Sequence, residues 1–596
     1  MIQLRRGPLI GMALPLAIAC APAAHATSCE TISPTAFNLG GGATVVSAQG
    51  TEVTGGSFLP PGYTAPITGL PPFCRVQITA SSNGNPAQSL ISIEAWLPEQ
   101  GWNGRFIGTG NGGYAGTLDY VALSQRLQEG FAVANDDLGT GLRFDCNPLS
   151  CGDATGGGSK PGGLYGDAQS IRDFGYAATH VMTLVGKQVT GAVYGSQPAH
   201  SYFAGCSTGG QNAFSESQRY PADYDGILAG APAHNRTHQI ASSPALYANA
   251  GEPGGYLTNA ALGLIHANVL ARCAGHDGGL ATDDFLEQPY SCSADVHQLI
   301  CRGVSNEVPC TDPTSAQCSC LTPAQATTIG VYWNGVNDDL GRREQPGFER
   351  GAEEPIPLTA ANGYIGDIGL TWTQIQAEPD FDSLFYWIYG PTWSWSSFLT
   401  QHRNTNVLIS RALDNADASP VGNDTLAGIV NANSPDLSAF SSHGGRMLLY
   451  QGYDDPLIPS ATAINYYTAV FATDPIGVNR YLRLFMAPGV EHCDGGPGAN
   501  SFGGTSQPTP PAPLDRKDDA LGALMAWVEH GDGPTRITAT KYINDTPADG
   551  VAFQRPLCQY PLHAAYRSGD TTKAASFVCV PSVPVLNQMT DPHWGD

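Results

Sequence analysis

Charged residues are scarce in this chain of 596 residues, because Asp, Glu, Lys and Arg together make up only 13% of it. Cationic side chains are the rarer kind, with 28 Lys and Arg against 52 Asp and Glu and a formal net charge of −24. A surface this acidic repels phosphate backbones and anionic lipids. We therefore expect neither nucleic acid nor a membrane surface as a partner.

Two other patterns are missing. The 15 cysteines are scattered and form no paired Cys-x-x-Cys set, which disfavours a zinc centre. Beyond the N-terminus, no apolar stretch is long enough to span a bilayer. What is abundant is apolar and turn-forming: hydrophobic residues make up 42%, and there are 72 Gly and 45 Pro. The composition excludes a disordered chain and predicts a large, loop-rich protein with more than one folding unit.

The N-terminus has the layout of a signal peptide. Arg5 and Arg6 precede a mostly apolar run over 8–19, and Ala24-His25-Ala26 offers a small-x-small cleavage site. We predict a signal peptide over 1–26 and a secreted or periplasmic protein. The alternative is lipidation at Cys20, which is disfavoured because Ala17 stands where such sites prefer Leu.

The cysteines fit export to an oxidising compartment. Without Cys20, 14 remain, enough for seven disulfides. Spacing alone does not fix the pairing, but two near neighbours are plausible local bridges, Cys146–Cys151 and Cys558–Cys579.

Two parts of the chain read as alternating strands and helices. The first has extended runs at 90–97, 105–107, 131–134 and 201–204 and a helical pattern over 170–187. The second has strands at 446–450 and 481–486 and a helix over 518–530. Between them, 232–440 is cysteine-rich and irregular. This pattern predicts an α/β core in two parts, 27–231 and 441–596, with an inserted domain at 232–440.

One motif offers a nucleophile. Gly205-Cys206-Ser207-Thr208-Gly209 follows a short strand and precedes a probable helix, the context of a nucleophile elbow. Glycines permit the sharp turn that exposes the serine hydroxyl. A plain glycine-rich turn gives the same five residues, so the motif needs support from elsewhere.

Support comes from two later strands. In an α/β-hydrolase the acid and the base follow the nucleophile in the order Ser, Asp or Glu, His. Asp454 and Asp455 follow the strand at 446–450, and His492 follows the strand at 481–486. Most other histidines lie in irregular or inserted segments, where surface or structural roles are the simpler interpretation.

Two cysteines strengthen this interpretation. Cys206 directly precedes the predicted nucleophile, and Cys493 directly follows the predicted base. A disulfide between them would hold the two backbones together across 287 positions of sequence. Chance adjacency of both cysteines to these positions is improbable, and we predict this disulfide.

At this point the chain resembles the tannase/feruloyl esterase family, which includes the bacterial mono(2-hydroxyethyl) terephthalate hydrolases. The resemblance is carried by 205–210, Tyr220-Pro221 with Asp225-Gly226, Gly452 with Asp455-Pro456, and His492-Cys493. It covers most of the chain and is weakest in the insert. It implies an α/β-hydrolase core with a large inserted lid domain and hydrolysis of esters of aromatic acids.

The resemblance also assigns roles by position. Ser207 corresponds to the nucleophile, Asp455 to the acid, with Asp454 as its competitor, and His492 to the base. The oxyanion hole is expected from the N–H groups of Thr208 and Gly113, with Gly112 as the alternative to Gly113.

The family often carries a calcium loop in the lid between paired cysteines. Here the corresponding stretch runs from Cys273 to Cys292, with Asp277, Asp283 and Phe285 as the expected ligand positions. Ala274 stands where the first aspartate is expected, and two residues are inserted. The two interpretations are therefore a structural Ca²⁺ site in the lid and a solvated acidic loop without a metal. We expect no cofactor for catalysis.

The sequence predicts a secreted serine esterase that acts on small esters of phenolic acids. The alternatives are a terephthalate monoester hydrolase and, in another class, a non-catalytic binding protein on the same fold. The terephthalate alternative is disfavoured because those enzymes carry Glu after the nucleophile, where this chain has Thr208. Aromatic residues of the insert are expected to stack on the substrate ring or to form lid core: Trp387, Trp393, Trp395 and Phe398.

Overall fold

The structure, a computed structural model, describes residues 27–114, 116–141, 164–239, 241–315, 317–353, 384–390, 392–400, 405–508 and 515–582. The predicted signal peptide with Cys20 and the predicted Cys146–Cys151 bridge lie outside these ranges.

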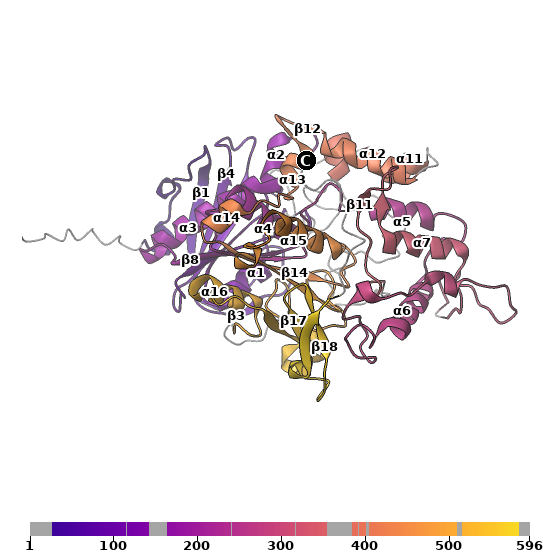
Figure 1. Ribbon diagram of the computed structural model, residues 1–596. Coiled ribbons are helices and arrows are strands. Elements are labelled where there is room, and N and C mark those ends of the chain that lie inside the picture. The colour runs from indigo at the N-terminus through magenta and orange to yellow at the C-terminus, as the bar shows by residue number, and fades with distance from the viewer. Residues whose placement is uncertain are drawn as a thin grey trace, which may run out of the picture.

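A nine-stranded mixed sheet forms the centre of the protein (Figure 1). In spatial order its strands are β1 (Thr44–Val53), β4 (Phe73–Ser81), β5 (Ile91–Pro98), β7 (Ala132–Asp136), β6 (Arg105–Thr109), β8 (His200–Cys206), β9 (Gly226–Gly230), β14 (Arg446–Gly452) and β15 (Leu482–Ala487). The six from β7 to β15 are parallel, and β1, β4 and β5 add antiparallel pairs at one edge. The carboxyl ends of β6, β8, β14 and β15 therefore meet at one edge of the sheet, where ligands bind in such folds.

Helices cover both faces of the sheet, as in a three-layer α/β fold. On one face, α3 (Ala178–Tyr194), α4 (Thr208–Arg219) and α15 (Ala461–Thr473) pack on strand residues such as Phe203, Ile227 and Leu449. On the other face, α1 (Tyr120–Gln128) and α16 (Ala520–His530) pack on the adjacent residues of the same strands, Tyr202, Leu228 and Leu448. Alternate residues of each strand thus enter opposite cores, and the central strands read as continuous apolar runs.

The predicted helix over 170–187 is interrupted. It comprises α2 (Ala168–Arg172), a π-helical turn η5 (Asp173–Ala177) and α3 in direct succession. Gly175 lies in the π turn, where an added Cβ would stand 2.6 Å from the carbonyl oxygen of Ile429. The helix therefore passes the insert at contact distance.

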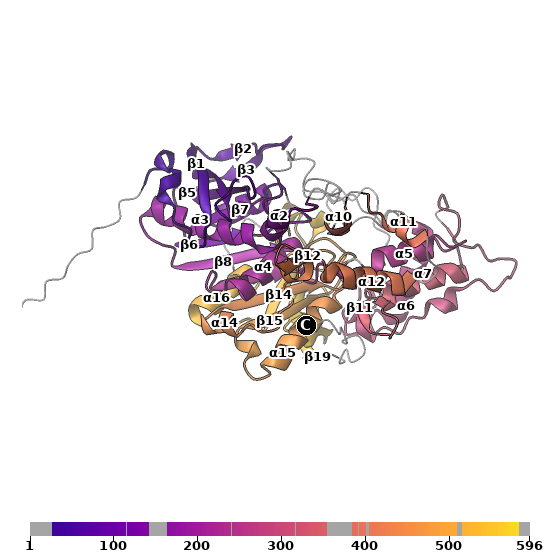
Figure 2. The same cartoon turned by 90° about the horizontal axis from the view of Figure 1, so that it is seen from above.

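The insert contributes no strand to the large sheet within its described residues. It contains more helix than its sequence suggests: α5 (Ser242–Ala250), α6 (Asn259–Cys273), α7 (Pro323–Asn334), α10 (Leu384–Tyr389), α11 (Trp395–Thr400), α12 (Thr405–Asp417) and α13 (Leu426–Val430). Local signals fix α7, which begins with a capping box between Thr322 and Gln325 and ends at Gly335, φ 67°. Figures 1 and 2 both place α5, α6 and α7 at one end of the molecule, away from the sheet.

The C-terminal part differs from the predicted continuation of the core. After α16 it forms two antiparallel ribbons, β16 (Arg536–Tyr542) with β17 (Val551–Cys558), and β18 (Leu562–Tyr566) with β19 (Phe577–Pro581). The predicted Cys558–Cys579 disulfide is confirmed and joins the two ribbons. The second ribbon reaches the insert, since the N–H of Tyr566 donates to the carbonyl oxygen of Gly278 at 2.8 Å.

Shorter elements complete the described chain. The strand pairs are β2 (Gly56–Phe58) with β3 (Ile67–Leu70), β10 (Val336–Asn337) with β11 (Arg343–Gln345), and β12 (Pro420–Val421) with β13 (Asp424–Thr425). The remaining helical turns are η1 (Cys29–Thr31), η2 (Pro34–Ala36), η6 (Pro289–Ser291), η7 (Val296–Leu299), α14 (Ser438–Ser442), η8 (Val478–Arg480), η9 (Ile543–Asp545), η10 (Pro547–Asp549) and η11 (Ala574–Ser576).

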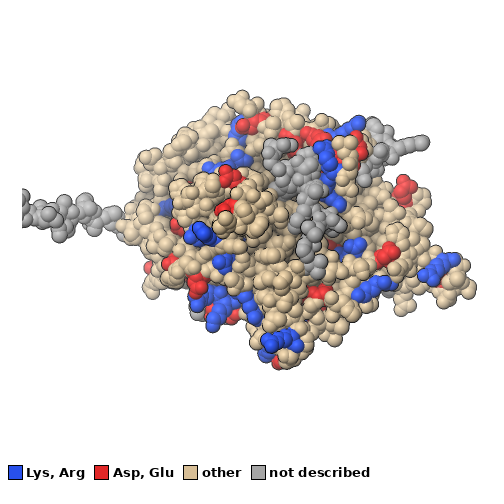
Figure 3. Space-filling model, in the orientation of Figure 1, with Lys and Arg blue, Asp and Glu red and all other residues tan. Residues whose placement is uncertain are grey.

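Six disulfides form among the described residues: Cys29–Cys74, Cys206–Cys493, Cys273–Cys292, Cys301–Cys320, Cys310–Cys318 and Cys558–Cys579. In the same ranges, no helix combines the length and apolar character needed to cross a bilayer. Acidic and basic side chains are interspersed over the face seen in Figure 3, among a larger number of other residues.

Candidate active site

Ser207 lies on a sharp turn between β8 and α4. Its backbone has φ 62° and ψ −120°, a conformation that non-glycine residues rarely adopt. Two backbone hydrogen bonds hold the turn, from Ser207 N–H to the oxygen of Gly230 at 3.1 Å and from Ala233 N–H to the oxygen of Ser207 at 3.0 Å. The local geometry is that of a nucleophile elbow at the end of a central strand.

Close backbone approach explains the glycines around the serine. A Cβ on Gly205 would stand 2.5 Å from the oxygen of Gly209, and one on Gly210 would stand 2.5 Å from the oxygen of Gly230. Both distances are too short for any side chain. The motif is therefore required by packing at this turn.

His492 and Asp455 form a buried hydrogen-bonded pair. The distance from His492 Nδ1 to Asp455 Oδ2 is 2.8 Å, and the two side chains are 1% and 0% exposed. Asp455 also accepts hydrogen bonds from the backbone N–H groups of Leu457 and Ile458, both at 2.9 Å, and from the side-chain amide of Gln451 at 2.8 Å. These donors fix the carboxylate, which in turn fixes the orientation of the imidazole.

The disulfide Cys206–Cys493 connects the serine turn to the histidine loop. Its Cα atoms are 5.9 Å apart, and each half-cystine is the direct neighbour of Ser207 or His492. The loops after β8 and β15 are thereby fixed to each other at the carboxyl edge of the sheet.

The glycine-rich loop after β6 lies against the start of α4. Gly209 N–H donates to the oxygen of Asn111 at 2.6 Å, and the Thr208 hydroxyl donates to the oxygen of Gly113 at 2.6 Å. An added Cβ on Gly110 would stand 2.4 Å from the Cα of Gly209. The two backbone segments predicted to supply the oxyanion hole are thus in direct contact, and only glycine at 110 permits it.

A buried arginine that the sequence analysis missed lies behind this contact. Arg236 follows β9, is 3% exposed and donates to Thr208 Oγ1 at 3.0 Å and to the oxygen of Gly113 at 3.3 Å. No motif or spacing marks this residue in the sequence.

The four predicted aromatic residues lie in one hydrophobic cluster of the insert but differ in their surroundings. Trp387 packs edge-on against Tyr114, the residue after Gly113, at 5.3 Å between ring centroids. Trp395 is fully buried among Phe385, Trp393 and Phe398, as expected of a core residue. Trp393 and Phe398 are partly buried and contact each other at 5.0 Å. Trp387 is therefore placed next to the predicted oxyanion loop, and Trp395 belongs to the packing of the insert.

The contacts of the predicted calcium loop do not fit a calcium site. Both carboxylate oxygens of Asp277 accept backbone N–H groups, from Gly279, Glu287 and Gln288. Asp283 accepts the N–H of Leu280 at 3.0 Å and a guanidinium N–H of Arg555 at 2.8 Å. Phe285 stacks on Phe553 at 6.3 Å between centroids. Calcium needs six to eight converging oxygens, whereas here the carboxylates face nitrogen donors and a cationic side chain.

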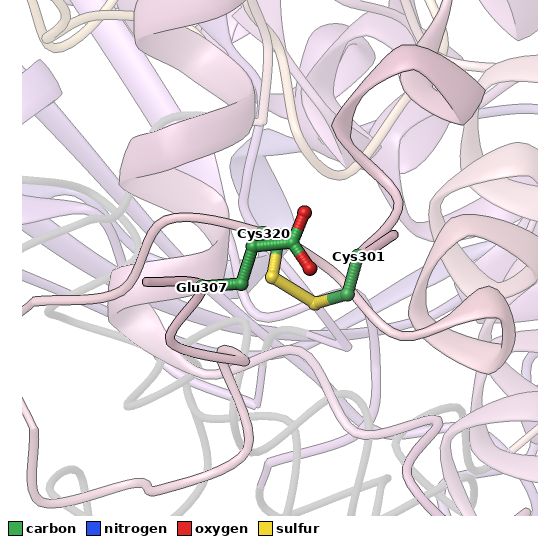
Figure 4. Close-up of side chains that lie close together, drawn as sticks. All are labelled: Cys301, Glu307 and Cys320. Atoms are coloured by element: carbon green, nitrogen blue, oxygen red, sulfur yellow. A yellow bond between two sulfur atoms is a disulfide. The ribbon is translucent and has the colours of Figure 1, made fainter. Parts of the chain in front are cut away.

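Two other groups of possible metal ligands occur in the described ranges, and neither needs a metal. Figure 4 shows Glu307 beside Cys301 and Cys320, but these two sulfurs are bonded to each other, so no thiolate is present. Glu307 instead accepts the backbone N–H groups of the 302–304 turn. In the second group, His180 pairs with Asp223 at 2.7 Å, and Lys187 next to them supplies positive charge.

The sheet order, the elbow at the end of β8 and the His–Asp pair beyond β14 and β15 define an α/β-hydrolase. A profile described as "Tannase and feruloyl esterase" matches residues 74–580. The chain belongs to this family of carboxylic ester hydrolases.

Relatives and solved structures agree with this assignment. An uncharacterized esterase of Xanthomonas campestris pv. campestris is 32% identical over 556 residues, which is 90% of this chain and 89% of the relative. A probable feruloyl esterase B-2 of Aspergillus flavus is 28% identical, over 82% and 84% of the two chains. The crystal structure of feruloyl esterase B from Aspergillus oryzae superposes with a TM-score of 0.73 at 26% identity, and covers 93% of this chain and 99% of that one.

Proposed function

We propose that this protein is a serine esterase that cleaves esters of phenolic acids through a Ser207–His492–Asp455 triad. The observation that carries the proposal is the combination of a strained serine elbow with a buried His–Asp pair, joined by the Cys206–Cys493 disulfide. Asp455, rather than Asp454, is the carboxylate bonded to His492.

In the proposed mechanism, Ser207 Oγ attacks the ester carbonyl while His492 takes its proton. The N–H groups of Thr208 and Gly113 stabilise the oxyanion. The imidazolium then gives its proton to the departing alcohol, which leaves an acyl-enzyme. Water, activated by His492, attacks this intermediate, and the acid is released with Ser207 restored.

The preferred substrates in this proposal are small, neutral esters of phenolic acids. Several relatives bear the name feruloyl esterase. A terephthalate monoester carries a carboxylate that requires a paired cation in a dry pocket. Arg342 of the insert, one cation that could take this part, already pairs with Asp338. Position 208 is Thr, where the terephthalate hydrolases of the family carry Glu.

We further propose that 232–440 forms the lid of the core halves 27–231 and 441–596. This is supported by the end of β9 at Gly230 and the start of β14 at Arg446. The N-terminal signal layout and the disulfides favour a secreted or periplasmic location.

Two measurements test the proposal. Ser207→Ala and His492→Ala should abolish turnover while circular dichroism and melting temperature stay near those of the wild type. A panel of methyl gallate, methyl ferulate and mono(2-hydroxyethyl) terephthalate should give the highest kcat/KM on a phenolic ester. Activity retained by Ser207→Ala would contradict the triad, and the highest kcat/KM on the terephthalate ester would contradict the substrate class. Absence of turnover on every ester by the wild type would favour the non-catalytic alternative.

A further inference from the structure

The Arg236 guanidinium is enclosed by groups of the predicted oxyanion hole. It donates to the hydroxyl of Thr208 and to the carbonyl of Gly113, the two residues whose N–H groups are proposed to bind the oxyanion. The rings of Tyr114 and Phe174 lie 4.4 Å and 5.5 Å from its central carbon. The Thr208 hydroxyl also donates to Gly113, so three groups form one closed network.

The charge of Arg236 has no counter-ion within the described part of the chain. None of the ion pairs found there involves Arg236, and its Nε is buried without a hydrogen-bond partner. Burial lowers the pKa of Arg236 to about 9, so the group is cationic at neutral pH. Burying an unpaired charge is costly, and such a cost is characteristic of functional sites.

We propose that Arg236 is a positioning residue whose positive charge stabilises the oxyanion of the tetrahedral intermediates. Its hydrogen bonds hold the Thr208 side chain and the Gly113 carbonyl, in the two segments that supply the N–H donors. Its charge has no partner until negative charge develops on the substrate oxygen. Such preorganised electrostatics favours the transition state over the bound ester and therefore acts on kcat rather than on KM.

Arg236→Met tests this inference, which rests on the proposed triad. We expect kcat to fall by about tenfold to a hundredfold, with KM changed less than about threefold. An arylboronate, whose adduct with the serine mimics the tetrahedral anion, should lose affinity by the same factor. The uncharged ester should bind to a Ser207→Ala protein equally well with and without Arg236→Met, because it carries no negative charge.

The matched control is Arg483→Met. Arg483 also lies over an aromatic ring, Trp527 at 4.7 Å, and donates to a carbonyl, that of Pro534 at 2.7 Å. It stands at the amino end of β15, on the edge of the sheet opposite to the site. Arg483→Met should keep the wild-type kcat at temperatures where it is folded.

Arg236→Lys gives a second readout should the Met variant not fold. A buried lysine loses its proton below its usual pKa, so kcat of this variant should begin to fall at a lower pH than that of the wild type, whose Arg236 stays cationic up to about pH 9. The inference is overturned by a Met variant with kcat within about threefold of wild type, or by a Lys variant with the wild-type pH profile. Ser207→Ala separates the two failures, because its inactivity supports the triad whatever Arg236 does.

A separate set of contacts concerns the loop between Cys273 and Cys292. Arg555 of β17 reaches into it, pairs with Asp283 at 2.8 Å and lies over the rings of Phe553 and Phe577 at 4.6 Å and 4.5 Å. The side chains of Arg555 and Asp283 are 5% and 9% exposed.

We infer that the Arg555 guanidinium provides the positive charge that a bound cation would supply to this loop. The loop is then held by a side chain from the C-terminal ribbon and needs no calcium. Purified wild-type protein should contain no stoichiometric calcium, and its melting temperature should be the same with calcium chloride and with a chelator.

Arg555→Met should lower the melting temperature by several degrees, because it leaves Asp283 buried without its partner. Arg536→Met, in the same ribbon and bonded to the carbonyl of Ala574, is the control and should lower it less. One calcium per wild-type chain, or a melting temperature that rises with calcium, would overturn the inference. These measurements involve no catalysis and stand apart from the proposed function.

Discussion

Cys206 and Cys493 are 287 positions apart in sequence and are joined by a disulfide with a Cα–Cα distance of 5.9 Å. The whole insert, 232–440, lies between these two cysteines in the sequence. Because each is the neighbour of a proposed catalytic residue, the bond fixes the relative position of Ser207 and His492 more directly than any other covalent link in the described chain.

The first prediction concerns this bond. Cys206→Ala/Cys493→Ala should lower kcat on the order of tenfold to a hundredfold, because a displacement near 1 Å between reacting groups is costly. Stability should also decrease, by about 2–5 kcal/mol. Kinetics measured well below the melting temperature separate the two effects.

Cys301→Ala/Cys320→Ala is the matched control, since it removes a disulfide of the insert far in sequence from both loops. It should cost stability and leave kcat near wild type. Equal kcat values for the wild type and the Cys206/Cys493 variant would make that disulfide a purely stabilising one.

The second prediction distinguishes two adjacent carboxylates. Asp455→Asn should reduce kcat on the order of 10³- to 10⁴-fold, because the amide no longer orients and stabilises the protonated imidazole. Asp454→Asn, a change of the same size one position earlier, should reduce it far less. Comparable losses in the two variants, at unchanged melting temperatures, would reassign the acid.

The third prediction tests the contact between the oxyanion loop and the nucleophile helix. Gly110→Ala places a methyl group 2.4 Å from the Cα of Gly209, so the two segments must separate. We expect kcat to fall on the order of tenfold to a hundredfold. Gly330→Ala in α7, where the nearest atom to the new Cβ is 3.9 Å away, serves as the control and should be silent in kinetics.

The fourth prediction concerns the pH dependence of the insert. His238 lies 2.8 Å from Asp417 and 3.2 Å from Glu344. Burial opposes its charge, but the two carboxylates outweigh burial and raise the pKa of His238 to about 10. The folded-state pKa lies above the unfolded-state pKa of about 6.5. The charged His238 therefore contributes its full stabilisation at pH values below about 6.5. This contribution is lost as the pH rises toward 10.

The melting temperature of His238→Gln should therefore lie below that of the wild type at pH 6, and the difference should shrink steadily toward pH 10. A difference that is constant with pH would show that His238 is neutral in the folded protein.

The strands of the core and the candidate site residues could be predicted from the sequence for a physical reason. Strands β8, β14 and β15 are short apolar runs buried on both faces, and each is followed by a loop that carries one residue of the proposed triad. Three such signals in the right order make Ser207, Asp455 and His492 predictable.

Other parts depend on partners remote in sequence. Strand β1 is a mostly exposed edge strand whose identity comes from pairing with β4, and its sequence shows no sustained apolar run. Helices α6 and α7 carry apolar residues around much of their circumference, so no amphipathic pattern marks them. Arg236 and Arg555 contact partners remote in sequence through their long side chains, and no local sequence pattern predicts such contacts.

The contact of the last ribbon with the insert has a consequence for synthesis on the ribosome. The chain emerges from its N-terminus, so Asp283 and Gly278 are made some 270 residues before Arg555 and Tyr566 exist. During the first part of that interval, until residue 487 has been made, β14 and β15 are also incomplete or missing, and the parallel part of the sheet ends at β9. The insert of the growing chain therefore lacks its contacts with the C-terminal ribbons until those strands have been made. In a chain truncated before residue 555, the loop between Cys273 and Cys292 lacks these contacts permanently and is exposed to proteases.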